Sequence, residues 1–220
     1  MEPLTYDLIK SRCSIDIPEE EQHLLCYKNV NLHFIIIMKK ILPTENDMGT
    51  ITNEQRTSIK NINTCKCRAN KLLVLKIVNY LTGEELNEII NNNCIHISTD
   101  IKTTTYIKNE IVYPDYFDTK PEIICGAGIH YYNSLEPCIF IKRPAILNYK
   151  YNGNLRTYRA NGELHSERNF INGIMVGPHE IYYGNVDGEL CQKGNFINVN
   201  MDGDRKIYYE NGKIKLFLFS

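Results

Sequence analysis

A 26-residue repeat near the C-terminus constrains the fold of this chain more than any other feature. The segment Asn169–Gly177 is followed 26 positions later by the similar segment Asn195–Gly203, and the register continues from Ile181-Tyr182-Tyr183 to Ile207-Tyr208-Tyr209. Asn-Gly or Asp-Gly separates segments rich in aromatic and β-branched residues, and these dipeptides enter the positive-φ positions of tight hairpin turns at little cost. The sequence therefore predicts a repeating array of β-hairpins.

A second motif recurs between these blocks. It reads Tyr158-Arg-Ala-Asn-Gly-Glu-Leu164, Tyr183-Gly-Asn-Val-Asp-Gly-Glu-Leu190 and Tyr209-Glu-Asn-Gly-Lys-Ile214. Over residues 149–220 this pattern resembles degenerate MORN-type repeats, of the variant also seen in bacterial antitoxin-like proteins. The resemblance implies a sheet of β-hairpins that serves as an interaction platform, and it says little about activity.

Residues 1–143 contain no repeat. We expect short helices over 3–10 and 19–26, strands over 32–42 and 71–78, and a loop over 43–63. Leu86, Ile89 and Ile90 have helical spacing and predict a further helix over 84–91. The expected fold class is therefore α+β, with an N-terminal α+β domain (1–143) and a MORN-like β-hairpin repeat sheet (144–220). Three incomplete repeats bury too little apolar surface alone, so we expect the sheet to pack against the first domain.

Two passages of the first half match a known pattern. One is Cys65-Lys-Cys-Arg-Ala-Asn-Lys71, and the other runs from Pro114-Asp-Tyr-Phe-Asp118 to Cys125-Gly-Ala-Gly-Ile-His-Tyr-Tyr132. Together they resemble an uncharacterised domain of giant viruses and phages, in which Lys-Cys-Arg-Ala precedes Pro-Asp-x-Phe-Asp and then Cys and Gly-Ile-His-Phe-Phe. The resemblance spans about 26–142, departs at Tyr131 and Tyr132 and by an insertion around 81–96, and implies a viral origin without an assigned activity.

The composition fits such an origin and excludes several functional classes. The chain has 30 Ile and 25 Asn but four Ala, a bias expected of an A/T-rich genome. Its 25 basic and 26 acidic side chains create no strongly positive field, and no apolar run approaches the ~20 residues of a membrane-spanning helix. The N-terminus lacks the layout of a secretory signal, so we expect the eight cysteines as thiols, in host cytoplasm, a virus factory or the virion.

Cys67, Cys125 and His130 are the motif residues with reactive side chains. Together they would supply a thiolate nucleophile and its base, and with Cys65 they would supply metal ligands. The Cys-x-Cys spacing is tighter than a zinc knuckle, and Cys94-Ile-His96 offers a ligand pair only if the fold permits it. We therefore predict buried thiols, no metal and no cofactor, and no enzymatic activity, with a Cys/His-dependent enzyme kept as an alternative.

Two further motifs have structural interpretations. Asp115 and Asp118 would be paired catalytic carboxylates only with a base that the sequence does not show, so we predict a loop role for both. Gly126-Ala127-Gly128 lacks the third Gly, the Lys and the Ser/Thr of a phosphate-binding loop.

The paired tyrosines suggest binding. Residues i and i+2 share a face of a strand, so one Tyr of each pair points inward while the other forms an exposed aromatic stripe. The leading hypothesis is a non-catalytic viral interaction or scaffold protein that binds a viral or host protein through the sheet and its junction with the first domain. The alternative is an RNA-binding or mRNA cap-binding module that stacks bases on tyrosines, with arginines on the phosphates. The candidate binding residues are Tyr131, Tyr132, Tyr182, Tyr183, Tyr208, Tyr209, Arg168 and Arg205.

Overall fold

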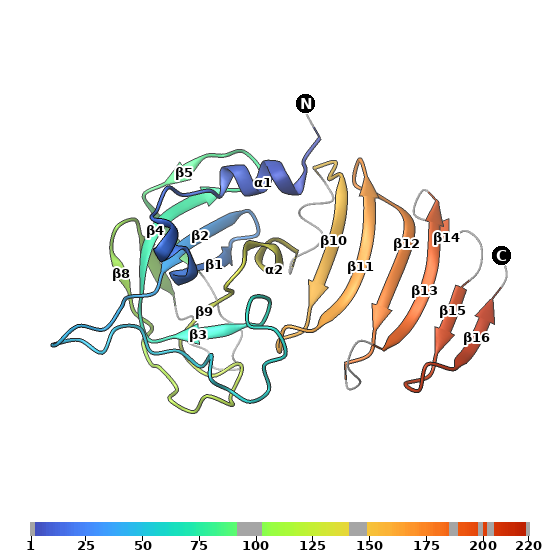
Figure 1. Cartoon of the computed structure of the whole chain (residues 1–220). Coiled ribbons are helices and arrows are strands. Elements are labelled where there is room, and N and C mark those ends of the chain that lie inside the picture. The colour runs from blue at the N-terminus through green and yellow to red at the C-terminus, as the bar shows by residue number, and fades with distance from the viewer. Residues whose placement is uncertain are drawn as a thin grey trace.

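The computed structural model describes residues 3–91, 103–140, 149–184, 189–197, 200–201 and 205–218. The proposed ligand pair Cys94 and His96 lies outside these residues. Within them, sixteen strands and three short helices form two regions: an N-terminal region of antiparallel β-structure and a C-terminal sheet of hairpins, coloured orange to red in Figure 1.

The described structure is mostly β, so the predicted α+β class is wrong. The helices are α1 (Tyr6–Arg12), the 3₁₀ helix η1 (Glu19–Leu24) and α2 (Leu135–Phe140). Thr5 caps α1 by accepting a hydrogen bond from the Leu8 backbone N–H. The expected helix over 19–26 begins as predicted but stops at Leu24, because the next residues pair with a neighbouring strand.

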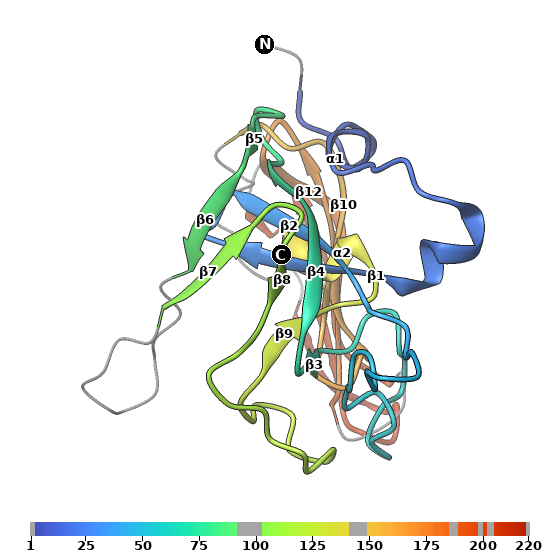
Figure 2. The same cartoon turned by 90° about the vertical axis from the view of Figure 1, so that its left-hand side faces the viewer.

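The N-terminal region is built on a five-stranded antiparallel sheet. Its order is β1 (Leu25–Val30), β2 (Phe34–Lys39), β4 (Leu72–Asn79) and β5 (Glu85–Leu86), and β8 (Ile111–Val112) also pairs with β4. Two ribbons accompany it: β3 (Cys67–Ala69) with β9 (Ile129–Tyr131), and β6 (Glu88–Asn91) with β7 (Thr104–Ile107). Figure 2 shows β6 and β7 leading away from the sheet.

Strand β2 is buried on both faces. Ile35 and Ile37 point into one core with α1, α2 and the start of the repeat sheet, whereas Ile36 and Met38 point into a second core with the β3–β9 ribbon. Because neither face meets solvent, β2 needs no alternation of apolar and polar residues, which explains the continuous run from Phe34 to Met38.

The predicted helix over 84–91 is also wrong, since these residues form β5 and β6. Gly83, at φ 84°, turns the chain back so that β5 pairs with β4. Ile89 faces inward from β6, and its register partner Tyr106 is almost fully buried. Pairing with β7, whose Thr, Tyr and Ile residues favour strands, overrides the helical spacing.

The C-terminal sheet has the order β10 (Gly153–Tyr158), β11 (Leu164–Ile171), β12 (Ile174–Tyr182), β13 (Leu190–Ile197), β15 (Arg205–Tyr208) and β16 (Ile214–Leu218), and β14 (Asn200–Met201) pairs with β13. Asn172 and Gly173 have φ values of 53° and 78°, the geometry of a tight hairpin turn. The predicted array of hairpins is thus present over the described residues.

The first hairpin shares a core with the N-terminal region. Leu155 and Phe170 pack with Phe140 and Tyr151, and the Phe140 and Tyr151 rings meet edge to face with centroids 5.8 Å apart. Later strands extend away from this core as one layer (Figure 1). No helix among the described residues has the length and apolar character needed to cross a membrane.

Candidate functional site

A joint between the two regions is the first feature that could serve function. The loop before β3 holds the turn of the first hairpin: Arg56 Nη2 donates to Ala160 O at 2.9 Å, and Thr64 Oγ1 donates to Gly162 O at 2.7 Å. The backbone N–H of Lys66 also donates to Ala160 O at 3.0 Å. A Cβ on Gly162 would lie 2.2 Å from Asn61 O, so these two segments of the chain approach too closely for any residue other than glycine.

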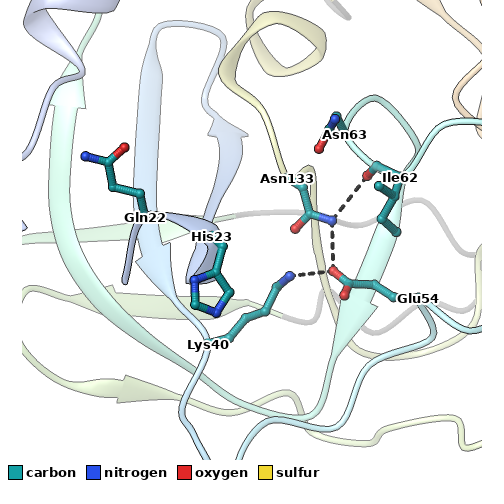
Figure 3. Close-up of a pocket in the computed structure, with 7 residues that line it drawn as sticks. All are labelled: Gln22, His23, Lys40, Glu54, Ile62, Asn63 and Asn133. Atoms are coloured by element: carbon teal, nitrogen blue, oxygen red, sulfur yellow. Dashed lines mark hydrogen bonds and ion pairs between the residues drawn. The ribbon is translucent and has the colours of Figure 1, made fainter. Parts of the chain in front are cut away.

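A pocket of about 550 Å³ lies beside this loop. Figure 3 shows its seven lining residues, Gln22, His23, Lys40, Glu54, Ile62, Asn63 and Asn133, which come from η1, the end of β2, the joint loop and the segment after β9. Its volume falls within the range of small-molecule sites. Six of its seven lining residues carry polar side chains, unlike the mostly apolar side chains of sites that bind drug-sized ligands.

Glu54 is the centre of the pocket's polar network. One oxygen, Oε1, is 2.6 Å from Lys40 Nζ and accepts hydrogen bonds from Tyr131 OH at 2.8 Å and Asn133 Nδ2 at 2.9 Å. Burial works to raise the pKa of Glu54, but the donors, led by Lys40, hold it below its usual value. The Glu54 carboxylate is therefore ionised, and the Lys40 ammonium balances its charge. The Lys40–Glu54 pair leaves no unbalanced charge in the pocket.

Two thiols, one in the joint loop and one at the start of β3, lie in contact with each other. Cys65 Sγ and Cys67 Sγ are 3.2 Å apart, and both residues are fully buried. The hydrogen bond from Cys67 lowers the pKa of Cys65, with Arg56 acting in the same direction against burial. The pKa of Cys67 is raised, by the same hydrogen bond first and by burial second. In the part of the chain that the structure describes, no group of three His, Cys, Asp or Glu side chains can hold a metal ion.

The predicted Cys67, Cys125 and His130 set is not assembled. Cys67 pairs with Tyr131, and Arg68 pairs with His130, in the β3–β9 ribbon; side chains alternate along a strand, so Cys67 and His130 lie on opposite faces. Cys125 is exposed, and its Sγ accepts a hydrogen bond from Lys66 Nζ at 3.6 Å. Burial, with nearby Lys66, Lys28 and Arg68, lowers the pKa of His130 to about 3, so the imidazole is neutral.

The motif residues of the first half instead organise a loop around a buried arginine. Arg68 is fully buried and donates to the backbone carbonyls of Ile123 at 3.1 Å, Asp118 at 2.6 Å and Lys120. Its guanidinium lies 5.4 Å from the centroid of the Phe117 ring. The Lys-Cys-Arg-Ala and Pro-Asp-x-Phe-Asp elements are therefore two halves of one structural unit.

Asp118 and the glycines complete that unit. Asp118 Oδ1 accepts from Lys120 N at 2.9 Å, which is turn chemistry. A Cβ on Gly126 would lie 2.8 Å from Asp118 Oδ2, and one on Gly128 would lie 3.2 Å from Ala69 O. These glycines permit close packing of the loop on β3. Asp115 lies in the same loop and takes part in an interaction of its own.

The paired tyrosines are less exposed than the predicted aromatic stripe requires. Tyr131 is almost fully buried and held by Glu54, and Tyr132 is half-buried in a bridge with Tyr27. Tyr182 donates to Glu180 Oε2 at 2.7 Å. Among the paired tyrosines Tyr209 alone is exposed, with 49% of its surface open to solvent.

Each hairpin repeats one irregularity. A bulge follows Thr157, Ile181 and Ile207, so that Tyr158, Tyr182 and Tyr208 face Leu164, Leu190 and Ile214 respectively. The residue after each bulge tyrosine then links one hairpin to the next. Arg159 Nη2 donates to Tyr182 O at 2.7 Å, and Tyr183 OH donates to Tyr208 O. Tyr209 occupies the same position in the last described hairpin.

The predicted arginines also make contacts within the sheet. Arg168 Nε donates to His179 Nε2 at 3.0 Å, and Arg205 Nη2 donates to Gln192 Oε1 at 2.8 Å. The last strand also exposes three aliphatic side chains: Ile214, Leu216 and Leu218. Sequence reasoning missed this apolar face, although the alternating spacing of these residues could have indicated it. It also missed Arg56 and Glu54, which lie in a segment with only loop character.

Comparison with known proteins gives one family and no activity. The model of a family of unknown function (DUF5758) matches residues 13–138, which include both motif passages of the first half. No curated protein and no solved structure matches the chain. Because the matched segment covers more than half of the sequence, the chain belongs to the family of unknown function DUF5758.

Proposed function

We propose that this protein binds a partner protein through the open end of its repeat sheet, where an extended strand of the partner pairs with β16. The observation that carries this proposal is the uncovered apolar face of that strand. Sheets normally bury such a face against a second layer, and strand addition is a recurrent way of recognising an extended peptide.

The apolar face of β16 is formed by alternate residues. Ile214, Leu216 and Leu218 are 53%, 43% and 43% exposed, and Leu216 lies beside Ile207 of β15 in the register of the sheet. No other element crosses β15 or β16 in Figure 1. Within the described residues β16 pairs with β15 alone, so its outer backbone groups are available for another strand.

The linking position supports an added strand. Arg159 and Tyr183 each donate to a carbonyl of the following hairpin. The Tyr209 hydroxyl donates to nothing in the described part of the chain, and its ring contacts Lys215 Nζ at 5.5 Å from the centroid. An added strand would give the Tyr209 hydroxyl a backbone carbonyl as acceptor. The following hairpin gives Arg159 and Tyr183 the same kind of acceptor.

The charges of the sheet favour a protein over a nucleic acid. Lys193 pairs with Glu180 at 2.8 Å and Arg156 with Glu167 at 3.4 Å, while Lys206 lies 5.1 Å from the centroid of the Phe217 ring. Phosphate binding needs cations that are free to replace counterions. The resemblance to a giant-virus domain makes a viral protein, or a host protein of the infected cell, the partner class to test first.

The test compares two exposed aliphatic positions. Leu216→Asp places a charge on the proposed face, whereas Ile171→Asp places one at the turn between β11 and β12, where the side chain is 56% exposed. Purified full-length protein and both variants would be used to capture partners from infected cells, with thermal unfolding as the control for folding. We expect a directly binding partner whose affinity falls about tenfold or more for Leu216→Asp and is unchanged for Ile171→Asp.

A partner of another kind would give a different result in this binding test. A dimer that dissociates in Leu216→Asp would identify a second copy of the chain as the added strand. Binding of capped or uncapped single-stranded RNA at low salt, unaffected by Leu216→Asp, would replace the proposal by the nucleic-acid alternative. Equal partner binding by wild type and Leu216→Asp would show that β16 is not the docking strand.

A further inference from the structure

The contact between Cys65 and Cys67 differs from the environment of the other buried cysteines. Their sulfur atoms are 3.2 Å apart, whereas Cys26 Sγ, equally buried, donates to Met38 O at 3.6 Å. Two sulfurs in contact need little movement to form a bond. Cys65 lies in the loop that joins the two regions of the molecule, and Cys67 is the first residue of β3, which follows that loop.

A buried cation accompanies the pair. Arg56 is 2% exposed, and one of its nitrogens, Nη2, donates to Ala160 O. Its Nε and Nη1 have no hydrogen-bond acceptor, and its guanidinium no carboxylate partner, among the described residues. A buried charge is costly unless an opposite charge lies beside it. Arg56 is among the groups that lower the pKa of the Cys65 thiol, so ionisation of Cys65 would place the missing opposite charge beside the guanidinium.

We propose that Cys65 and Cys67 form a thiol-oxidation site, in which Cys65 is the reacting thiolate and Cys67 the resolving thiol. The oxidant class is a small hydroperoxide such as hydrogen peroxide. Small size matters because Cys65 and Cys67 have no exposed surface, so a bulky oxidant could not reach them.

The chemistry requires two displacements. The Cys65 thiolate attacks one peroxide oxygen, the O–O bond breaks, and the leaving hydroxide takes the proton that had left Cys65, giving water and a sulfenic acid. The Cys67 sulfur then attacks the Cys65 sulfur, the S–O bond breaks, and the second hydroxide leaves as water with the Cys67 proton. The two thiols lose two electrons in total, and one peroxide is reduced to two waters.

The position of the pair gives the oxidation a structural consequence. The residues on either side of Cys65, Thr64 and Lys66, donate to Gly162 O and Ala160 O of the first hairpin turn. Bond formation draws the Cys65 and Cys67 side chains together and moves these neighbours. We therefore expect the amide of Lys66 to exchange with solvent faster after oxidation.

The test uses the full-length protein and hydrogen peroxide. After increasing exposure to peroxide, free thiols are blocked, the protein is digested, and each cysteine is measured by mass spectrometry. We expect a Cys65–Cys67 disulfide that dithiothreitol reverses, formed about tenfold or more faster than any oxidation of Cys26 or Cys138, which are equally buried. Cys67→Ser should accumulate a Cys65 sulfenic acid that dimedone traps, and Cys65→Ser should leave Cys67 unreactive.

Two results would overturn the proposal. One is the absence of the disulfide under conditions that fully oxidise the exposed Cys125, and the other is oxidation of Cys65 no faster than that of Cys26. Both comparisons are made within the wild-type chain, so they decide the question even if a serine variant fails to fold. Neither depends on a partner of the repeat sheet.

Discussion

The two regions of this molecule use similar strand residues but bury them to very different extents. In β2, four consecutive side chains from Ile35 to Met38 have no exposed surface, because cores lie on both sides. In β16, Ile214, Leu216 and Leu218 retain 43–53% of theirs. Residue type alone therefore does not separate a core strand from a binding strand; the presence of a covering layer does.

The largest loss of stability is expected where a buried polar group has no substitute partner. Arg68→Met leaves the carbonyls of Asp118, Lys120 and Ile123 without their donor, and we expect the free energy of unfolding to fall by about 3–5 kcal/mol. Arg205→Met, on the half-buried face of the repeat sheet, should cost less than about 1 kcal/mol. Chemical denaturation measures both, and equal losses would contradict the contrast.

Truncation of apolar side chains should follow burial. Ile37→Ala removes fully buried atoms and is expected to cost about 2–5 kcal/mol, because a cavity remains in the core. Leu216→Ala changes a half-exposed side chain and should alter stability by about 0.5 kcal/mol or less. Should the two variants melt at the same temperature, the last strand would have to be covered in solution.

The joint should be sensitive to a single methyl group. Gly162→Ala places a Cβ against Asn61 O at a φ of 93°, and we expect a loss of about 2 kcal/mol with faster proteolysis of the first hairpin turn. Gly177→Ala is the matched control, since its φ is also positive at 69° but a Cβ there meets nothing within 4 Å. The control should lose only the backbone strain, about 1 kcal/mol. Identical proteolysis of both variants would argue against a close joint.

The smallest effect concerns acid stability. The pKa of His130 is about 3 in the folded chain and about 6.5 when unfolded, so the unfolded state binds a proton that the folded state does not. Stability contributed by the neutral imidazole is complete above pH 6.5 and is lost as the pH falls toward 3. His130→Gln should therefore weaken the fall in stability between pH 6.5 and 5, by up to about tenfold in the folding equilibrium per pH unit. Unchanged pH profiles from thermal unfolding would show that His130 titrates normally.

Local sequence determined the features that depend on neighbouring residues. Asn172-Gly173 forms a positive-φ turn, and the 26-residue spacing brings equivalent bulges to Ile181-Tyr182 and Ile207-Tyr208. The run from Phe34 to Met38 forms a strand because its β-branched residues favour extended backbone. These features arise from preferences that act within a few residues, so a pattern in the sequence suffices to predict them.

Tertiary structure decided the features that depend on distant partners. Residues 84–91 became strands because β7 pairs with β6, Tyr131 became a core residue because Glu54 accepts its hydroxyl, and Arg68 found its acceptors 50–55 positions away. Exposure of β16 likewise depends on whether another layer covers it. Cys65 and Cys67 are close in sequence, but the tertiary structure brings the first hairpin turn to the loop that contains Arg56 and Cys65. Burial and long-range pairing set these energies, and a periodic pattern in one segment carries no information about either.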